Sequence, residues 1–315
     1  MKLNIPDELE NLFDSFREKN KKKKIYPKIK NIILTSSDGN DFPFLHYTAL
    51  GIGNLIFTYL YALYIKLNIK NSKIISFFPF RVHPLIRNLN YMYNRSSFEF
   101  NFNLKHLKRL LYFFELKNAN KEIFIKKNNL FLSTDIVNQD ELMFKKISSL
   151  DLDLIKKEIA PNFNLDYSIK NNNDLKLIYN KDNYISVGLH LRRGDFKINR
   201  SASSNFNTSP DIQDQINIIK KIETKIKVIN IYSDQKPILT LKELNGELKN
   251  YKLNFFSEKA NGTKVLQDMT KNDVIILSNS TLSTLSCILS NQLGLFNNQL
   301  FPNKLKKYFK NIKEI

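Results

Sequence analysis

Three apolar runs in the second half of the chain, each ending in polar residues, restrict the fold more than any other feature. They are YISVGLH, KVINIYSD and DVIILSNS, over residues 184–190, 227–234 and 273–280. Each is followed by a helical pattern, over 209–223, 264–271 and 281–290. Strands that alternate with helices predict a parallel sheet. Because the carboxyl ends of parallel strands share one edge of the sheet, the polar residues predict a binding site at that edge.

The first half shows the same alternation more weakly. NIILT over 31–35 reads as a short buried strand, and KIISFFPF over 73–80 as a second. Between them, Gly51 and Gly53 mark the start of a helix that is apolar around most of its circumference, which predicts a buried helix. Another helix is expected over 103–116, where leucines recur at helical spacing. The chain is therefore expected to be an α/β protein.

A chain of 315 residues is long enough for two domains. The polar, turn-prone stretch between 171 and 182 predicts the boundary between them. We expect a basic N-terminal extension over 1–30, a first domain over 31–178 and a second domain over 179–315.

The charge balance predicts an anionic partner. The chain carries 49 Lys and Arg against 30 Asp and Glu, a formal net charge of +19. A nucleic acid, an acidic membrane surface or a phosphorylated substrate would each fit this excess. The lysine run within 17–30 is typical of a solvated linker, with an anion-binding patch as the alternative. A stripe of Lys105, Lys108 and Arg109 could face anionic lipid or solvent.

The single cysteine, Cys287, excludes an intramolecular disulfide and a thiolate metal cluster. The N-terminal residues lack the apolar core of an export signal, and no apolar run of about 18 residues occurs. We therefore expect a cytoplasmic protein, at most peripheral at the inner face of a membrane.

The segment HLRRGDF, over 190–196, places two adjacent arginines directly after the first apolar run. Arginine forks match phosphate oxygens in bidentate geometry, with about 1.5–3 kcal/mol for each charge-assisted hydrogen bond. Ser280 and Thr281 would open a helix whose N-terminal amides favour negative charge. Asp234 could accept two hydrogen bonds from a guanine edge. Taken alone, the two arginines could lie in a solvated turn, Ser280 and Thr281 could form an ordinary helix cap, and Asp234 could be a turn residue. Taken together, these residues predict a nucleotide site.

The pattern His190-x-Arg192-Arg193-x-Asp195 resembles the HxRRxD signature of α1,2-, α1,6- and protein O-fucosyltransferases. The form HLRRGDF and the order of the other segments are most similar to glycosyltransferase family 11, the α1,2-fucosyltransferases. IYSDQ over 231–235 resembles the FSDD segment of that family, and DMTKNDVIILSNSTLS resembles its third motif. LGIGNLIFTYLYALYIK over 50–66 is similar to its opening GGLGNQMFQYAFALA.

The chain departs from that family at several places. Gln235 stands where a second aspartate is expected, and Leu55 replaces the glutamine after Gly-Asn. The chain has no tryptophan, and about 30 residues precede its first strand. These differences concern the acceptor and the linkage more than the donor site.

The resemblance implies a GT-B-like architecture, with two Rossmann-like domains facing across a cleft. The first would lie on the acceptor side and the second would bind the GDP-sugar. It implies an inverting, metal-independent transfer of L-fucose from GDP-fucose to a glycan hydroxyl. The expected linkage is α1,2 to galactose in a surface polysaccharide or lipid-linked oligosaccharide, and no cofactor is expected besides the donor substrate.

The resemblance also gives roles to single residues. Arg192 and Arg193 would hold the pyrophosphate and stabilise the leaving GDP, and Asp195 would orient them. His190 would contact the nucleotide, and Asp234 its guanine. The other expected donor contacts are Gly53, Asn54, Asp268, Asn279, Ser280 and Thr281.

Fixed cations at a departing diphosphate stabilise the transition state more than the ground state. A metal on an Asp-x-Asp element could do the same, and Asp-Leu-Asp occurs over 151–153. This segment reads better as the acidic start of an amphipathic helix. Asp38, Asp41 and His46 are candidates for the base that takes the acceptor proton, and each could equally be a loop residue.

Two other functions stay open. One is a GT-B glycosyltransferase that uses another nucleotide-sugar or makes another linkage. The other is a basic nucleic-acid-binding protein, which the charge and the abundant Tyr and Phe would suit. The aromatic residues fall mostly inside apolar segments, and no nucleic-acid-binding motif occurs. The expected partners are therefore GDP-fucose, a glycan acceptor and, peripherally, an anionic membrane.

Overall fold

The computed structural model describes residues 29–35, 52–69, 72–76, 123–126, 128–133, 141–171, 174–191, 212–233, 237–244, 246–257 and 262–315. By its contacts the chain forms two compact units. The first consists of 1–50, 54–88 and 99–150, and the second of 51–53, 89–98 and 151–315. Each unit has a sheet of its own.

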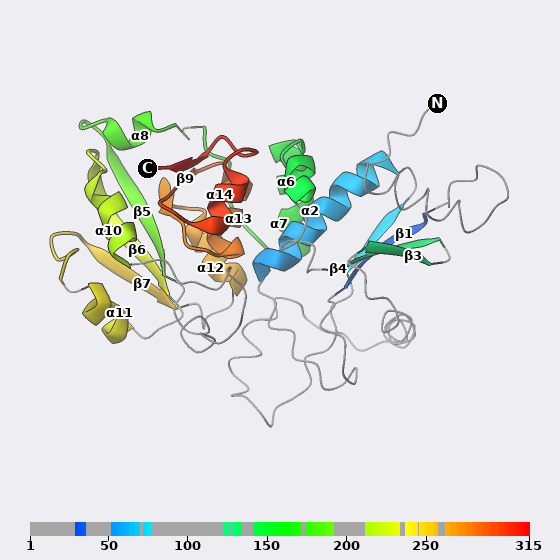
Figure 1. Ribbon diagram of the computed structural model, residues 1–315, viewed down its shortest axis with the longest axis horizontal. Helices are drawn as coiled ribbons and strands as arrows, with labels where there is room; N and C mark the ends of the chain where they lie inside the picture. The colour runs from blue at the N-terminus through cyan, green and yellow to red at the C-terminus, as the bar shows by residue number, and fades with distance from the viewer. Residues whose placement is uncertain are drawn as a thin grey trace, which may run out of the picture. The chain divides into compact units, whose positions relative to one another are not determined.

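The second unit is built on a sheet with six strands among the described residues (Figure 1). They are β5 (Tyr184–Leu191), β6 (Lys225–Ser233), β7 (Leu253–Ser257), β8 (Val274–Ile276), β9 (Leu293–Phe296) and β10 (Ile312–Glu314). They lie in the order β10-β9-β8-β5-β6-β7, and every neighbouring pair is parallel. If the six strands are numbered in chain order from β5 and followed across the sheet from β7, they have the Rossmann order 3-2-1-4-5-6. Its topological switch point lies between β5 and β8.

Helices cover both faces of this sheet. The described ones are α7 (Leu152–Phe163), α8 (Lys176–Tyr179), α10 (Ile212–Lys220), α11 (Pro237–Leu244), α12 (Gly262–Met269), α13 (Thr281–Ser290) and α14 (Leu300–Leu305). α10 and α11 lie on one face, and α12, α13 and α14 on the other (Figure 1). Right-handed crossovers to either side of β5 require this division. Ile216 and Ile219 of α10 pack in one core with Val187 and Leu189 of β5.

The chain divides into its two units between residues 150 and 151, earlier than the boundary at 178/179 expected from the sequence. α7 packs against α13, and the backbone N–H of Lys170 donates to the carbonyl of Ser290 at 2.8 Å. The side-chain amide of Asn291 donates to the carbonyl of Lys170 at 3.0 Å. The polar stretch over 171–182 lies inside the second unit because the chain on both of its sides packs there.

The first unit has a smaller sheet, with four strands among the described residues. They are β1 (Asn31–Thr35), β2 (Lys73–Ser76), β3 (Ile123–Lys126) and β4 (Asn129–Ser133), in the order β2-β1-β4-β3. β1 is parallel to β2 and β4, and β3 is antiparallel to β4. The helices α2 (Ile52–Asn68) and α6 (Glu141–Ile147) meet through the rings of Phe57 and Phe144, edge to face at 5.5 Å.

The α/β class expected from the sequence is confirmed, and the expected strands and helices form where they fall on described residues. The strand expected over 273–280 is shorter than predicted, because only Val274–Ile276 form β8. α2 is buried around most of its circumference, as predicted. The helix expected over 103–116, with its basic stripe, and residues 1–28 of the extension lie outside the described residues. None of the described helices combines the length and hydropathy needed to cross a bilayer.

Candidate functional site

The carboxyl ends of β5 and β8 meet at the topological switch point, and a buried hydrogen bond joins them. Nδ1 of His190, in β5, lies 2.7 Å from the hydroxyl oxygen of Ser278, which follows β8. Both residues are fully buried. These two strand ends therefore lie side by side, as the parallel sheet predicts.

A glutamine of α10 ties the same two strand ends together. Nε2 of Gln215 donates to the carbonyl of His190 at 2.9 Å and to the carbonyl of Leu277 at 3.2 Å. Sequence reasoning missed this residue. The signal that could have found it is a polar side chain on an apolar stripe, because Gln215 is buried on the side of α10 that also carries Ile216 and Ile219.

Ser280 begins α13 at this edge of the sheet. Its backbone is extended, with φ −137° and ψ 137°, and its hydroxyl oxygen accepts from the backbone N–H of Leu282 at 3.2 Å. The side-chain oxygen of Asn279 accepts from the backbone N–H of Phe301 at 2.8 Å, which ties the turn to α14. The amino end of α13, where a helix favours negative charge, thus follows the carboxyl end of β8.

The starts of α12 and α13 lie close to residues 52 and 53 of the second unit. A Cβ atom on Gly53, in the first turn of α2, would lie 2.5 Å from Oγ1 of Thr281 and 2.9 Å from its carbonyl carbon. A Cβ atom on Gly262, the first residue of α12, would lie 3.3 Å from Cγ2 of Ile52. Residues 51–53 belong to the second unit by their contacts. Residues 52 and 53 therefore lie against the starts of α12 and α13, and only glycine fits at position 53.

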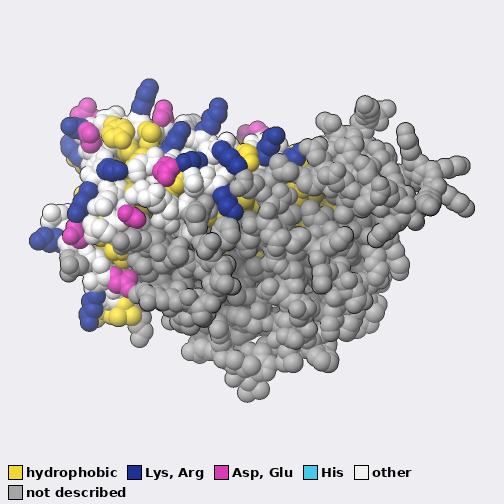
Figure 2. Space-filling view, viewed as in Figure 1, with side chains coloured by type: hydrophobic (Ala, Val, Ile, Leu, Met, Phe, Trp, Pro, Cys, Tyr) yellow, Lys and Arg dark blue, Asp and Glu magenta, His cyan; other side chains and the backbone are white. Residues whose placement is uncertain are grey.

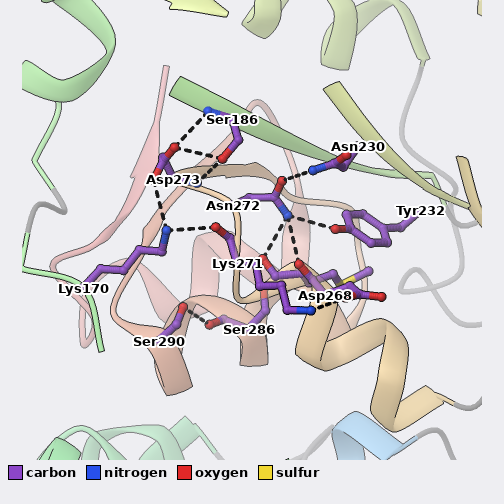
Figure 3. A network of polar contacts seen from close by, with 11 residues as sticks. Lys170, Ser186, Asn230, Tyr232, Asp268, Lys271, Asn272, Asp273, Ser286 and Ser290 are labelled. Atoms are coloured by element: carbon purple, nitrogen blue, oxygen red, sulfur yellow. Dashed lines mark hydrogen bonds and ion pairs between the residues drawn. The ribbon is translucent and has the colours of Figure 1, made fainter. Parts of the chain in front are cut away.

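A buried amide supports the middle of the sheet (Figure 3). Nδ2 of Asn272 donates to the hydroxyl of Tyr232 at 2.9 Å, and Oδ1 of Asn272 accepts from Nδ2 of Asn230 at 2.7 Å. A Cβ atom on Gly188 would lie 3.0 Å from Nδ2 of Asn272, so glycine leaves the room for this amide. Burial raises the pKa of Tyr232, and its neutral hydroxyl stays an acceptor in the network. The network fixes the last residues of β6, which Asp234 follows in the chain.

Asp268 belongs to α12. It is in the last turn of α12, which leads into the amino end of β8, and its carboxylate pairs with Lys271 at 2.8 Å (Figure 3). Its expected contact with the nucleotide rests on the resemblance alone.

Asp273 holds three segments of the second unit together near the amino end of β8. Its carboxylate accepts from the backbone N–H and the hydroxyl of Ser186 at 2.9 and 2.8 Å, and from the ammonium of Lys170 at 3.0 Å (Figure 3). Burial alone would raise the pKa of Asp273, but these hydrogen bonds outweigh burial and hold the pKa below its ordinary value.

Four expected site residues lie outside the described residues: Arg192, Arg193, Asp195 and Asp234. In the sequence the arginines directly follow Leu191, the last residue of β5, and Asp234 follows Ser233, the last of β6. Leu191 and Ser233 are partners in the β5–β6 register. The candidate bases Asp38, Asp41 and His46 also lie outside the described residues, and Asn54 lies in α2 within the first unit.

The carboxylate of Asp151 accepts from the backbone N–H of Leu154 at 3.0 Å and caps α7. This confirms the acidic helix start that the sequence predicts over 151–153. Within the part of the chain that the structure describes, no group of three or more His, Cys, Asp or Glu side chains is placed to share a metal ion.

No protein-family model and no curated protein sequence matches the chain. Among solved structures it is similar to POFUT1 in complex with GDP, with a TM-score of 0.43 and 12% identity over 84% of this chain and 95% of that one. It is also similar to a family 9 glycosyl transferase from Veillonella parvula, with a TM-score of 0.34 and 10% identity over 87% of this chain and 81% of that one. At such low TM-scores and identities, neither similarity identifies a function for this chain.

Proposed function

We propose that this chain is an inverting glycosyltransferase that transfers L-fucose from GDP-fucose to a glycan hydroxyl without a metal ion. The observation that carries the proposal is the place of HLRRGDF. The segment begins on β5 at the topological switch point, where open α/β sheets bind their ligands. Its histidine is hydrogen-bonded to Ser278, in the turn that starts α13.

The charges at this edge suit a departing diphosphate. Breaking the bond between the sugar and GDP moves negative charge onto the diphosphate, and guanidinium forks can stabilise that charge as it develops. The amino ends of α12 and α13, which both lie against residues 52 and 53, add the positive ends of two helix dipoles. Fixed cations and helix ends together supply the counter-charge that a divalent metal supplies in other transferases, which supports a metal-independent reaction.

In this proposal Arg192 and Arg193 bind the diphosphate, and Asp195 orients them. His190 contacts the nucleotide, and Asp234 accepts hydrogen bonds from guanine. Ser280 retains a hydroxyl hydrogen that it can donate to an oxygen of the diphosphate, because its oxygen is the acceptor in the cap of α13.

The acceptor side of the proposal rests on the resemblance to family 11 alone. It gives an α1,2 linkage to galactose in a surface polysaccharide or a lipid-linked oligosaccharide. We place the reaction in the cytoplasm, since a chain with one cysteine can form no internal disulfide that an oxidising compartment would favour.

Transfer or hydrolysis measured across a panel of GDP- and UDP-sugars, with and without EDTA, tests the proposal. We expect turnover of GDP-fucose above all other donors, with the same rate in EDTA. Preference for a UDP-sugar would contradict the donor, and loss of turnover in EDTA would contradict the metal-independent mechanism. Steeply salt-dependent binding of nucleic acid without affinity for GDP would show that the chain is a nucleic-acid-binding protein and not this enzyme.

A further inference from the structure

Helix α11 exposes apolar side chains. Ile238, Leu239 and Leu241 are 63%, 47% and 46% exposed, whereas Thr240 and Leu244 of the same helix are buried. Six large hydrophobic side chains of the described residues are exposed, and three of them lie in this helix of eight residues. Single exposed apolar residues are ordinary on protein surfaces, but a contiguous cluster marks an interaction site.

The exposed side chains of α11 share one face of the helix. At about 100° per residue, Leu241, Ile238, Lys242 and Leu239 follow one another within an arc of about 160°. Leu244 lies on the opposite side, where it packs in the core of the second unit. The outward face is therefore apolar, with the exposed Lys242 inside it. We call these four residues the α11 face.

The α11 face lies at the outer end of the second sheet. α11 connects β6 to β7, and β7 is the edge strand of that sheet among the described residues. Figure 1 shows the helix at the periphery of the second unit, and at the same place Figure 2 shows hydrophobic, basic and acidic side chains next to one another.

The charges around α11 favour an anionic partner. Lys249 and Lys252 are exposed in the segment that leads from α11 into β7. Glu247 is paired with Lys220 at 2.6 Å, so its charge is compensated within the chain. The whole chain carries a formal charge of +19. Apolar side chains flanked by lysines are the combination that binds the headgroup region of an anionic bilayer.

We propose that the α11 face docks on the surface of an anionic membrane, with its three aliphatic side chains inserted among the headgroups and Lys242 paired with acidic lipid. A second copy of the chain fits this face less well. Two-fold pairing of two such helices would place Lys242 near its own copy, and like charges repel. Docking needs no donor or acceptor, so it stands independently of the proposed transfer reaction.

Co-sedimentation of the full chain with vesicles tests the proposal. We expect binding to vesicles of phosphatidylglycerol and phosphatidylcholine and much weaker binding to phosphatidylcholine alone. The triple variant Ile238→Gln, Leu239→Gln, Leu241→Gln should lower the partition coefficient at least about tenfold. Lys242→Gln should lower it about fivefold. Leu67→Gln, which changes a comparably exposed leucine of α2, should bind as the unchanged chain does.

Three results would overturn this inference. One is the absence of binding to anionic vesicles at low ionic strength. Another is undiminished binding by the triple variant, or, if that variant does not fold, by the single variants Ile238→Gln and Lys242→Gln. The third is a concentration-dependent dimer in light scattering that the triple variant abolishes, with no vesicle binding, which would identify a second copy of the chain as the occupant.

Discussion

The hydroxyl of Ser278 lies 2.7 Å from Nδ1 of His190, across the point where the sheet reverses its strand order. Both residues are buried, so the hydroxyl restricts the orientation of the ring and the nitrogen that carries its proton. The ring belongs to the segment whose two arginines we assign to the diphosphate. Ser278 is therefore a positioning residue in the proposed site.

Ser278→Ala should leave Nδ1 of His190 without its partner. We expect a loss of about 1–3 kcal/mol in the free energy of unfolding and about a tenfold lower kcat. The chemical shift of the His190 nitrogens in NMR spectra should also change, because the balance of tautomers depends on this hydrogen bond.

Ser290→Ala is the matched control for Ser278→Ala. The Ser290 hydroxyl is equally buried and donates to the carbonyl of Ser286 at 2.7 Å, at the other end of α13. The substitution Ser290→Ala should lower the free energy of unfolding but should change neither kcat nor the chemical shifts of the His190 nitrogens. Equal effects of the two substitutions on kcat would show that Ser278 has only a structural role.

Gly53→Ala should disturb the contact between Gly53 and the start of α13. The added Cβ atom would lie 2.5 Å from Oγ1 of Thr281 and 3.0 Å from the backbone nitrogen of Leu282, so the backbone must move. We expect destabilisation by about 1–3 kcal/mol and a loss of about ten- to a hundredfold in kcat/KM. Gly262→Ala, which meets only the side chain of Ile52, should cost much less. An unchanged kcat/KM in Gly53→Ala would show that this contact is not part of the functional site.

Gly188→Ala should be destabilising because of Asn272, and a double-mutant cycle can show it. The added methyl group would lie 3.0 Å from Nδ2 of Asn272. Alone, the substitution should cost about 1–3 kcal/mol in urea unfolding. In the background of Asn272→Ala its cost should fall by at least about 0.5 kcal/mol. Additive effects would show that the amide and the glycine do not depend on each other.

Asp273→Asn should lower the free energy of unfolding at neutral pH but not in acid. The folded-state pKa of Asp273 is depressed, so its stabilisation is present above the unfolded-state value of about 4 and is lost as the pH falls through the folded-state value. Urea unfolding at pH 7 and at pH 2 should show a gap from the unchanged chain only at the higher pH. Asp182→Asn, at an exposed position, should show no gap. A gap of equal size at both values would contradict the role of the charge.

Local pattern was sufficient to predict the parallel sheet of the second unit and the strands β5, β6 and β8, but not β7, β9 and β10. Runs such as YISVGLH are apolar because parallel strands are covered on both faces, and the polar residues at their ends mark one edge. The hairpin of β3 and β4 was not predicted from IFIKKNNLFLS, because short strands without clear alternation give little signal.

The partners of buried polar groups could not be predicted from local pattern. Gln215 contacts a carbonyl 25 residues away and another 62 residues away, and such pairs depend on tertiary packing. The division of the chain between residues 150 and 151 depends on such pairs as well, because Lys170 is bound to Asp273 and Ser290 far along the chain. The contact of Asp268 with the nucleotide was expected from the resemblance, and it stays a prediction.

GDP binding by the full chain, measured by calorimetry on the unchanged protein and on Arg192→Ala and Arg192→Lys, tests the central claim most directly. We predict that the unchanged chain binds GDP in the presence of EDTA and that Arg192→Ala abolishes binding and turnover while the unfolding midpoint is retained. Arg192→Lys should also bind poorly, because an ammonium group cannot reproduce the bidentate fork. GDP binding that survives unchanged in both variants would contradict a diphosphate site at the end of β5.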